Sequence, residues 1–290
     1  LFRGPVSART ALAESLNVPA VQVLRKGGLR RTLDLYRRLG FGSFTRDAEW
    51  YGDSLVLGGC EVTPLELARA YRTLAAGGAD SPLVWHDGAR GSGKKRVLSV
   101  ESCALVLDIL KDTRRLLPLY GEIFVEKGTA VAFKTGTSYG RRDAWTAAYN
   151  PAYTVVLWFG RAGGGPDAQL VGISMAAPGA IAILKSLSAG IPAGKAWYTP
   201  PPGVGKVRVC SLSGAALSPF CPSGRTVMNI RKVWRTVPCD MHALRDGKTA
   251  LIWPPELEDY NRKRFAQDDR SRRALIVSPM PGSRYLITPG

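Results

Sequence analysis

The sequence lacks any run of roughly 18 or more apolar residues, so no segment is expected to cross a bilayer as a helix. It also lacks a stretch with the composition of a secretory signal peptide. Glycine and proline contents are not extreme, and 45% of the residues are hydrophobic, which excludes a disordered chain. A chain of 290 residues with this composition is expected to fold into globular domains with a substantial core.

Acidic residues are scarce: 23 Asp and Glu stand against 40 Lys and Arg, and the formal net charge is +17. Such a charge suits a polyanionic partner. However, the basic pairs are scattered along the chain, no predicted helix collects them beside aromatic residues, and no zinc-finger or RNA-binding signature occurs. We therefore expect a solvated basic surface that faces an anionic membrane or cell wall, and no nucleic-acid partner.

Helix signals dominate the first part of the chain. The clearest is Thr63-Pro64-Leu65-Glu66, a capping box with proline at the first helical position, followed by an apolar stripe that ends at Gly77-Gly78. Apolar spacing and capping residues predict further helices over 7–14, from Asn17 to Gly27, over 29–40, from Ser99 to about 110, and from Pro178 to Leu187.

Strand signals take over from about residue 130. Residues 131–137, 144–149 and 153–159 are β-prone runs separated by short turns, which predicts consecutive antiparallel hairpins. Helices before and after such a sheet indicate an α+β fold, an antiparallel sheet flanked by helices. We expect three parts: a domain over 1–199, a linker and small cysteine-containing region over 200–273, and the start of a further β-domain over 274–290.

Two short motifs carry the chemistry. Lys134-Thr135-Gly136-Thr137 ends an apolar strand, and Ser15-Leu16-Asn17 lies between two helices. An ammonium group beside threonine hydroxyls can bind a carboxylate, and a glycine lets a ligand approach the strand backbone. The N–H group after that glycine can stabilise a developing oxyanion. Together the two motifs favour a substrate that ends in a carboxylate.

Three blocks resemble one family. They are residues 133–145 (FKTGTSYGRRDAW), 6–21 (VSARTALAESLNVPAV) and 57–71 (LGGCEVTPLELARAY), and they are similar to segments of bifunctional penicillin-binding proteins, particularly the penicillin-binding protein 1C group. The resemblance covers about residues 1–190, and the cysteine-containing tail also resembles the 1C type. It implies the transpeptidase fold shared with serine β-lactamases, truncated at the N-terminus.

The resemblance also implies an activity and its residues. A serine enzyme would cross-link peptidoglycan stem peptides through an acyl-enzyme and would bind β-lactams. Ser15 would relay a proton, while Asn17 would position the substrate and the lysine. Lys134, Thr135 and Thr137 would bind the substrate carboxylate. Gly136 would let the substrate approach the strand backbone, and the Thr137 N–H would contribute to the oxyanion hole. Trp145, beside the motif strand, is a further candidate for substrate contact.

One element of the family pattern is missing. The nucleophile belongs in a Ser-x-x-Lys ahead of Ser15, and residues 1–14 contain none; the match at Ser92-Gly93-Lys94-Lys95 comes too late and in a polar loop. We therefore expect a fragment that is inactive alone. The resemblance places the nucleophile, a glycosyltransferase region and a membrane anchor upstream, at the periplasmic face of the inner membrane, where lipid-linked precursors are also bound.

Two other functions remain open. A non-catalytic peptidoglycan-binding module would keep the carboxylate pocket without a nucleophile. Gly136-Thr137-Ser138-Tyr139-Gly140 also matches the Gly-x-Ser-x-Gly nucleophile elbow of α/β-hydrolases, with Asp143 and His242 following in the order of a triad. An elbow requires a helix after the turn, whereas a second strand is predicted there, so an esterase is disfavoured.

Three cysteines and a histidine come together in the tail: Cys210, Cys221, Cys239 and His242. These are the ligand types of zinc. Because the first spacing is longer than that of a usual zinc knuckle and the periplasm is oxidising, we expect one disulfide among the three cysteines rather than a metal. The sequence calls for no cofactor. Cys60 and Cys103 lie among apolar residues and are expected to be inert thiols.

Overall fold

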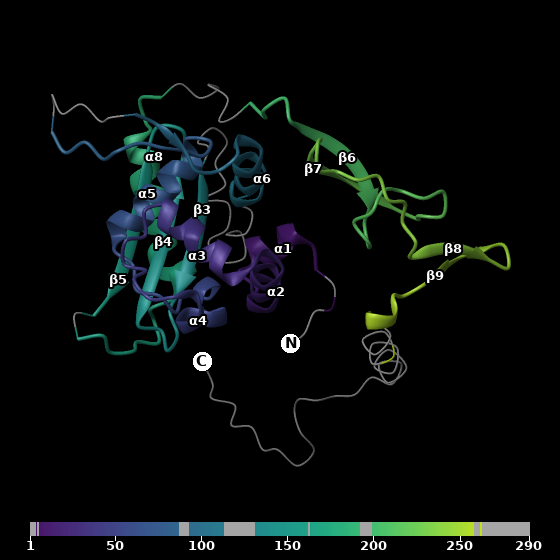
Figure 1. The fold of residues 1–290 in the computed structure, drawn as a ribbon, viewed down its shortest axis with the longest axis horizontal. Helices are drawn as coiled ribbons and strands as arrows, with labels where there is room; N and C mark the ends of the chain where they lie inside the picture. Colours follow the sequence, from purple (N-terminus) through teal and green to yellow (C-terminus); the bar gives the residue numbers. More distant parts are fainter. Residues whose placement is uncertain are drawn as a thin grey trace, which may run out of the picture. The chain divides into compact units, whose positions relative to one another are not determined.

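The computed structural model describes residues 4, 6–86, 93–112, 131–161, 163–191, 199–257 and 262 (Figure 1). The chain divides into two compact units. The larger one comprises Val6–Val207 and Thr226–Arg235, and the smaller one comprises Leu1–Pro5, Arg208–Arg225 and Thr236–Gly290. The β-domain predicted over 274–290 lies outside the described residues, as does Ser92.

The larger unit begins with helices, continues into a sheet and returns to a helix, which is the predicted α+β arrangement (Figure 1). Its first elements are α1 (Ala8–Ala13), α2 (Asn17–Gly27), α3 (Leu29–Arg38), α4 (Ala48–Tyr51), the 3-10 helix η1 (Gly52–Val56), α5 (Pro64–Ala75), β1 (Ala79–Asp80), β2 (Lys95–Arg96) and α6 (Val100–Leu110). The sheet and the segment after it are β3 (Ala132–Thr137), β4 (Asp143–Tyr149), β5 (Thr154–Gly160), the π-helical turn η4 (Gly172–Ala176) and α8 (Ala177–Leu187).

Local sequence signals explain most of these boundaries. Ser7 and Ser99 accept N-terminal hydrogen bonds of α1 and α6, and Thr63 and Glu66 form the predicted capping box of α5. The pairing of β1 with β2 was not predicted, because two-residue strands leave no periodic signal in the sequence. It joins the ends of a segment that the sequence marked only as a polar loop.

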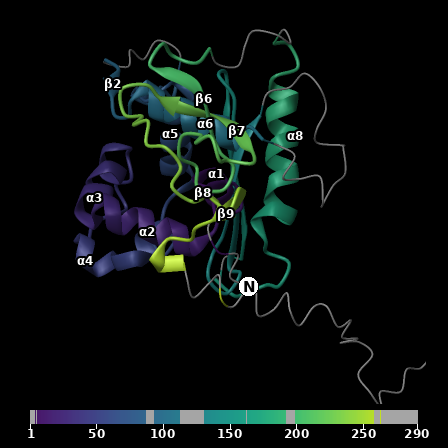
Figure 2. The ribbon, with the colours of Figure 1, turned by 90° about the vertical axis from the view of Figure 1, so that its right-hand side faces the viewer.

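The sheet is antiparallel with the order β3-β4-β5, so β3 is an edge strand. Alternate residues of each strand face opposite sides. Phe133 and Ala148 pack with Ile181 and Leu184 of α8, whereas Ala132 and Tyr149 pack with α6 and α5 on the other side. Figure 2 shows α8 alone on one side of the sheet and α5 and α6 on the other. Both faces are covered, which explains why apolar residues occur on both faces of β5 and of the buried parts of β3 and β4.

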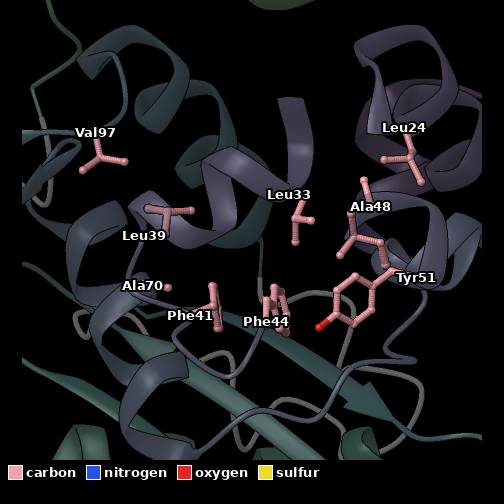
Figure 3. Packing of buried hydrophobic residues seen from close by; sticks show 10 residues of the cluster. Leu24, Leu33, Leu39, Phe41, Phe44, Ala48, Tyr51, Ala70 and Val97 are labelled. Atoms are coloured by element: carbon pink, nitrogen blue, oxygen red, sulfur yellow. The ribbon is translucent and has the colours of Figure 1, made fainter. Parts of the chain in front are cut away.

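A second core lies among the helices that precede the sheet (Figure 3). Phe41 and Phe44 stack at a centroid separation of 5.2 Å, and the Phe44 ring lies 5.6 Å from that of Tyr51. Leu33 of α3 and Leu24 of α2 are buried in the same cluster. This packing holds α2, α3 and α4 together and so supports the turn before α2 that carries Ser15.

A buried carboxylate joins α5 to β1. Asp80 accepts hydrogen bonds from Arg69 Nη2 at 2.6 Å and Arg69 Nε at 3.1 Å, and Arg72 and Thr73 lie beside it. The side chain of Asp80 is 9% exposed. The bonds from Arg69 lower the pKa of Asp80 although burial opposes them, so the ionised form stabilises the fold.

We expect Asp80→Asn to lower the free energy of unfolding by about 2 kcal/mol at neutral pH, since it leaves two guanidinium groups half-satisfied at a largely buried site. Because the pKa of Asp80 is depressed in the folded state, its contribution is complete above about pH 4 and is lost as the pH falls through the lower folded value. Urea denaturation at neutral and acidic pH would measure the loss of unfolding free energy and its dependence on pH. The control is Asp34→Asn, whose side chain is 70% exposed; an equal loss in both variants would contradict the prediction.

Four short strands and a 3-10 helix occur between residues 204 and 257. They are β6 (Val204–Cys210), β7 (Gly224–Ile230), β8 (His242–Arg245), β9 (Lys248–Leu251) and the 3-10 helix η5 (Pro255–Leu257). β6 pairs with β7, and β8 pairs with β9 in an antiparallel hairpin. Among the described residues, none of the helices has the length and apolar character needed to cross a membrane.

Candidate active site

Ser15 occupies a strained backbone position at the end of α1. The Leu16 N–H donates to the Ala11 carbonyl at 2.9 Å and the Ser15 N–H to the Leu12 carbonyl at 3.3 Å, which is a Schellman motif. Glycine is usual at the left-handed position of this motif, but here Ser15 holds it with φ 56°. A non-glycine residue in this region costs on the order of 1 kcal/mol and is typical of functional sites. Asn17 follows as the exposed first residue of α2.

Lys134 reaches Ser15 across 119 residues of sequence. Its Nζ donates a hydrogen bond to Ser15 Oγ and another to the Thr135 carbonyl at 2.7 Å. The lysine is half-buried on β3, whereas Ser15 is exposed in the turn between α1 and α2. The structure therefore brings together the two motifs that the sequence singled out, and it places a cation beside a hydroxyl at a surface open to solvent.

β3 has an edge without a partner strand among the described residues, and Lys134 lies on this strand. Within the described part of the chain, β3 pairs only with β4. The Ser138 N–H donates to the Asp143 carbonyl at 3.1 Å and so points toward β4. Because backbone groups of alternate residues point the same way, those of Thr135 and Thr137 point outward, in agreement with the bond from Lys134 to the Thr135 carbonyl. The Thr137 N–H thus faces the same open edge as the ammonium group.

Gly172 supports this strand from the α8 side and was not singled out from the sequence. Its N–H donates to Thr137 Oγ1 at 2.9 Å, and its carbonyl accepts from Thr146 Oγ1 at 3.3 Å. The Thr137 hydroxyl can accept this bond and still donate one of its own. A Cβ on Gly172 would lie 2.8 Å from the Trp145 carbonyl oxygen and closer still to that of Gly136. Only glycine lets η4 approach the motif strand this closely.

Trp145 lies on β4 directly opposite Gly136, on the same face of the sheet as Lys134. It is half-buried, and its ring lies 6.0 Å from that of Trp158. The Trp158 Nε1 donates to Asp143 Oδ1 at 2.9 Å. This bond to the Asp143 carboxylate helps to hold the two tryptophans beside the glycine.

The hydrolase elbow does not form. Ser138 lies in the turn between β3 and β4, where its Oγ accepts the backbone N–H groups of Arg142 at 3.2 Å and Asp143 at 2.9 Å. A strand follows this turn, not a helix. The Asp143 carboxylate contacts Trp158, and His242 belongs to the smaller unit. Ser138 therefore shapes a hairpin and has the surroundings of a structural residue.

The disulfide predicted for the tail is not formed. Cys210, Cys221 and Cys239 are free thiols, and so are Cys60 and Cys103. The three tail sulfurs converge on one atom, Nδ1 of His242, which brings all four groups within 4.8 Å of one another. A disulfide would join two of them and leave the third beside the histidine. Cys103 is buried, and burial raises the pKa of its thiol to about 11, consistent with an inert core residue.

Comparison with known proteins gives consistent results. The profile of a family described as "Penicillin binding protein transpeptidase domain" matches residues 2–178. The chain is 32% identical over 185 residues to penicillin-binding protein 1C of Escherichia coli, which covers 61% of this chain and 22% of that protein. It is 30% identical over 184 residues to penicillin-binding protein 1A/1B of Bacillus subtilis. That alignment covers 55% of this chain and 20% of the Bacillus protein.

A solved structure extends the likeness in fold. The crystal structure of penicillin-binding protein 1A from Haemophilus influenzae superposes with a TM-score of 0.66 at 20% identity and covers 82% of this chain and 41% of that one. At this identity the likeness shows the fold alone. The chain spans less than a quarter of the length of the curated relatives that it matches.

Proposed function

The chain belongs to the penicillin-binding protein transpeptidase domain family, and on that basis we propose that its Lys134–Ser15 site acts on the D-alanyl-D-alanine end of a peptidoglycan stem peptide. The observation that carries the proposal is the bond from Lys134 Nζ to Ser15 Oγ at the open edge of β3. A cation, a hydroxyl and an outward backbone N–H meet there, and together they suit a peptide that ends in a carboxylate.

The site would work as follows. The stem peptide lies along β3, as a strand added to a sheet edge, and its terminal carboxylate is bound by Lys134 and the hydroxyls of Thr135 and Thr137. A serine Oγ attacks the carbonyl between the two D-alanines, and the Thr137 N–H stabilises the oxyanion. Ser15 relays to the departing D-alanine nitrogen the proton that the attacking serine loses, as the C–N bond breaks. An amine of a second stem peptide then displaces the serine ester.

The attacking serine is the part that these residues do not supply. Residues 1–14 contain no Ser-x-x-Lys, and Ser138 is committed to its hairpin. We propose that the 290 residues contain the substrate-binding side of the site and form no acyl-enzyme by themselves. The glycosyltransferase activity, the membrane anchor and the contact with lipid-linked precursors at the periplasmic face of the inner membrane would belong to the longer protein.

The proposal is tested by intact mass after incubation with a penicillin. We expect no adduct on the 290-residue chain and one covalent adduct on a longer form that includes the predicted Ser-x-x-Lys. In parallel, NMR titration of the chain with an acyl-D-alanyl-D-alanine peptide should shift backbone signals of β3, because the proposed carboxylate site lies within these residues.

The other outcomes are equally informative. An adduct on the chain alone would mean that Ser92 or Ser138 is a nucleophile, and peptide mapping would identify it. Peptide binding without labelling of either form would leave a non-catalytic peptidoglycan-binding module. Absence of both, with both forms folded, would contradict the proposed substrate.

A further inference from the structure

We propose that Cys210, Cys221, Cys239 and His242 bind one Zn²⁺ ion as a closed tetrahedral site in the smaller unit. This proposal goes beyond the transpeptidase function and does not depend on it. All four side chains belong to the same unit. Cys210 ends β6, Cys221 lies in the loop that follows, Cys239 lies shortly before β8, and His242 is the first residue of β8.

The distances match those of a tetrahedral zinc site. The sulfurs of Cys210, Cys221 and Cys239 lie 3.6, 3.7 and 3.3 Å from His242 Nδ1. For zinc bonds of about 2.3 Å to sulfur and about 2.05 Å to nitrogen, tetrahedral geometry places sulfur and nitrogen about 3.6 Å apart. Hydrogen bonding does not explain the arrangement, because one ring nitrogen has a single N–H or a single lone pair and cannot serve three sulfurs.

Backbone pairing fixes the segments that carry the ligands. The Cys210 N–H donates to the Ala215 carbonyl at 2.8 Å, and the Cys239 N–H donates to the Ala216 carbonyl at 2.8 Å. Ala216 in turn donates to the Val237 carbonyl at 3.0 Å. These bonds align the turn after β6 with the segment before β8, so two cysteines 29 positions apart in sequence are held in register before any metal binds.

Further donors surround the sulfurs. Ser213 Oγ donates to Cys239 Sγ at 3.1 Å, and the Ser218 N–H donates to Cys221 Sγ at 3.4 Å. Hydrogen bonds to sulfur favour the thiolate form and orient the ligand, as they do around the ligands of metal sites generally. Cys210, Cys239 and His242 are buried, which suits a structural site without an open position for substrate.

The described part of the smaller unit has a small core. Its cluster of buried residues consists of Cys210, Cys239 and Met241, so two of the three members are proposed ligands. The residues packed against this cluster are only partly buried: Ala215, Leu217, Cys221 and Trp253. Small domains with so few buried apolar side chains usually depend on disulfides or a metal. No disulfide is formed by the described cysteines, and a metal is the remaining crosslink that the same side chains can make.

The test is metal content. The 290-residue chain is purified with zinc in the medium and dialysed against a weak chelator. We expect elemental mass spectrometry to find about one zinc ion retained per chain. Cys239→Ser should lose it, whereas Cys60→Ser, which changes a half-buried cysteine of the larger unit, should retain it. Cobalt substitution should give the visible bands of a tetrahedral thiolate site, weakened in His242→Asn.

A second measurement covers variants that fail to fold. Removing the metal from the unmodified chain with a strong chelator should speed hydrogen exchange in β8 and β9 and leave β3–β5 unchanged. A chain that retains no zinc while both units are folded would overturn the proposal. So would zinc retained by Cys239→Ser, or a mass deficit of two hydrogens with one cysteine pair resistant to alkylation, which would restore the disulfide.

Discussion

We expect Lys134→Met to lower the rate of acylation by penicillin about 1,000-fold in the longer form that includes the predicted Ser-x-x-Lys. In the proposed mechanism the lysine would have two functions. Its charge would bind the carboxylate, a contact worth about 1.5–3 kcal/mol, and its bond to Ser15 Oγ would orient the proton relay, whose removal typically costs about 10²–10⁴ in rate. Stopped-flow or time-resolved intact mass would measure the rate.

The matched control is Lys26→Met, the same substitution at an exposed lysine of α2. We expect it to leave acylation unchanged, so a general effect of lost positive charge on a +17 chain can be separated from a local one. Thermal unfolding should be nearly the same in both variants, because Ser15 is exposed and water can replace the lysine. Acylation within tenfold of the unmodified protein in Lys134→Met would contradict the proposed role.

Gly172→Ala should lower the free energy of unfolding by about 3 kcal/mol or more. The added methyl would meet the carbonyl oxygens of Gly136 and Trp145, which pair between β3 and β4. Paired backbone atoms cannot move aside as a flexible side chain can. To relieve the contact, η4 must separate from β3, which breaks the bond from the Gly172 N–H to Thr137 Oγ1. Stability and acyl-D-alanyl-D-alanine binding are therefore expected to fall together.

Gly165→Ala provides the comparison, since a Cβ on Gly165 would meet nothing within 4 Å. Chemical denaturation should show this variant to be as stable as the unmodified chain or slightly more stable, because alanine restricts the unfolded state. If Gly172→Ala unfolds at the same denaturant concentration as Gly165→Ala, the close approach of η4 to the sheet does not constrain the strand.

The sequence predicted those parts of the fold that local chemistry determines. Capping by Ser7, Ser99 and Thr63 and the three β-prone runs set boundaries that the structure reproduces within a residue or two. The meeting of Lys134 with Ser15 was implied only by the family resemblance, because nothing in the periodicity of either segment specifies a contact across 119 residues. Gly172 left no signal, since its requirement arises from tertiary packing.

The tail shows a different kind of limit. The number and spacing of the cysteines suggested a disulfide, but these cysteines are free thiols in the structure. Spacing along the chain says little when ligands come from separate segments, and here the backbone bonds at Ala215 and Ala216 decide which groups meet. The participation of His242 could be anticipated from the Cys-x-x-His spacing, but its position at the centre of the three sulfurs could not.

The edge of β3, which has no partner strand among the described residues, has a consequence for solubility and storage. Unpaired N–H and C=O groups on an edge strand can pair with the same strand of another copy and start aggregation. Natural sheets often guard such edges with lysine, and Lys134 lies at the middle of this one, on a strand of only six residues. The ammonium group that suits a carboxylate would thus also repel its own counterpart, so neutral replacements at Lys134 should be handled at low concentration.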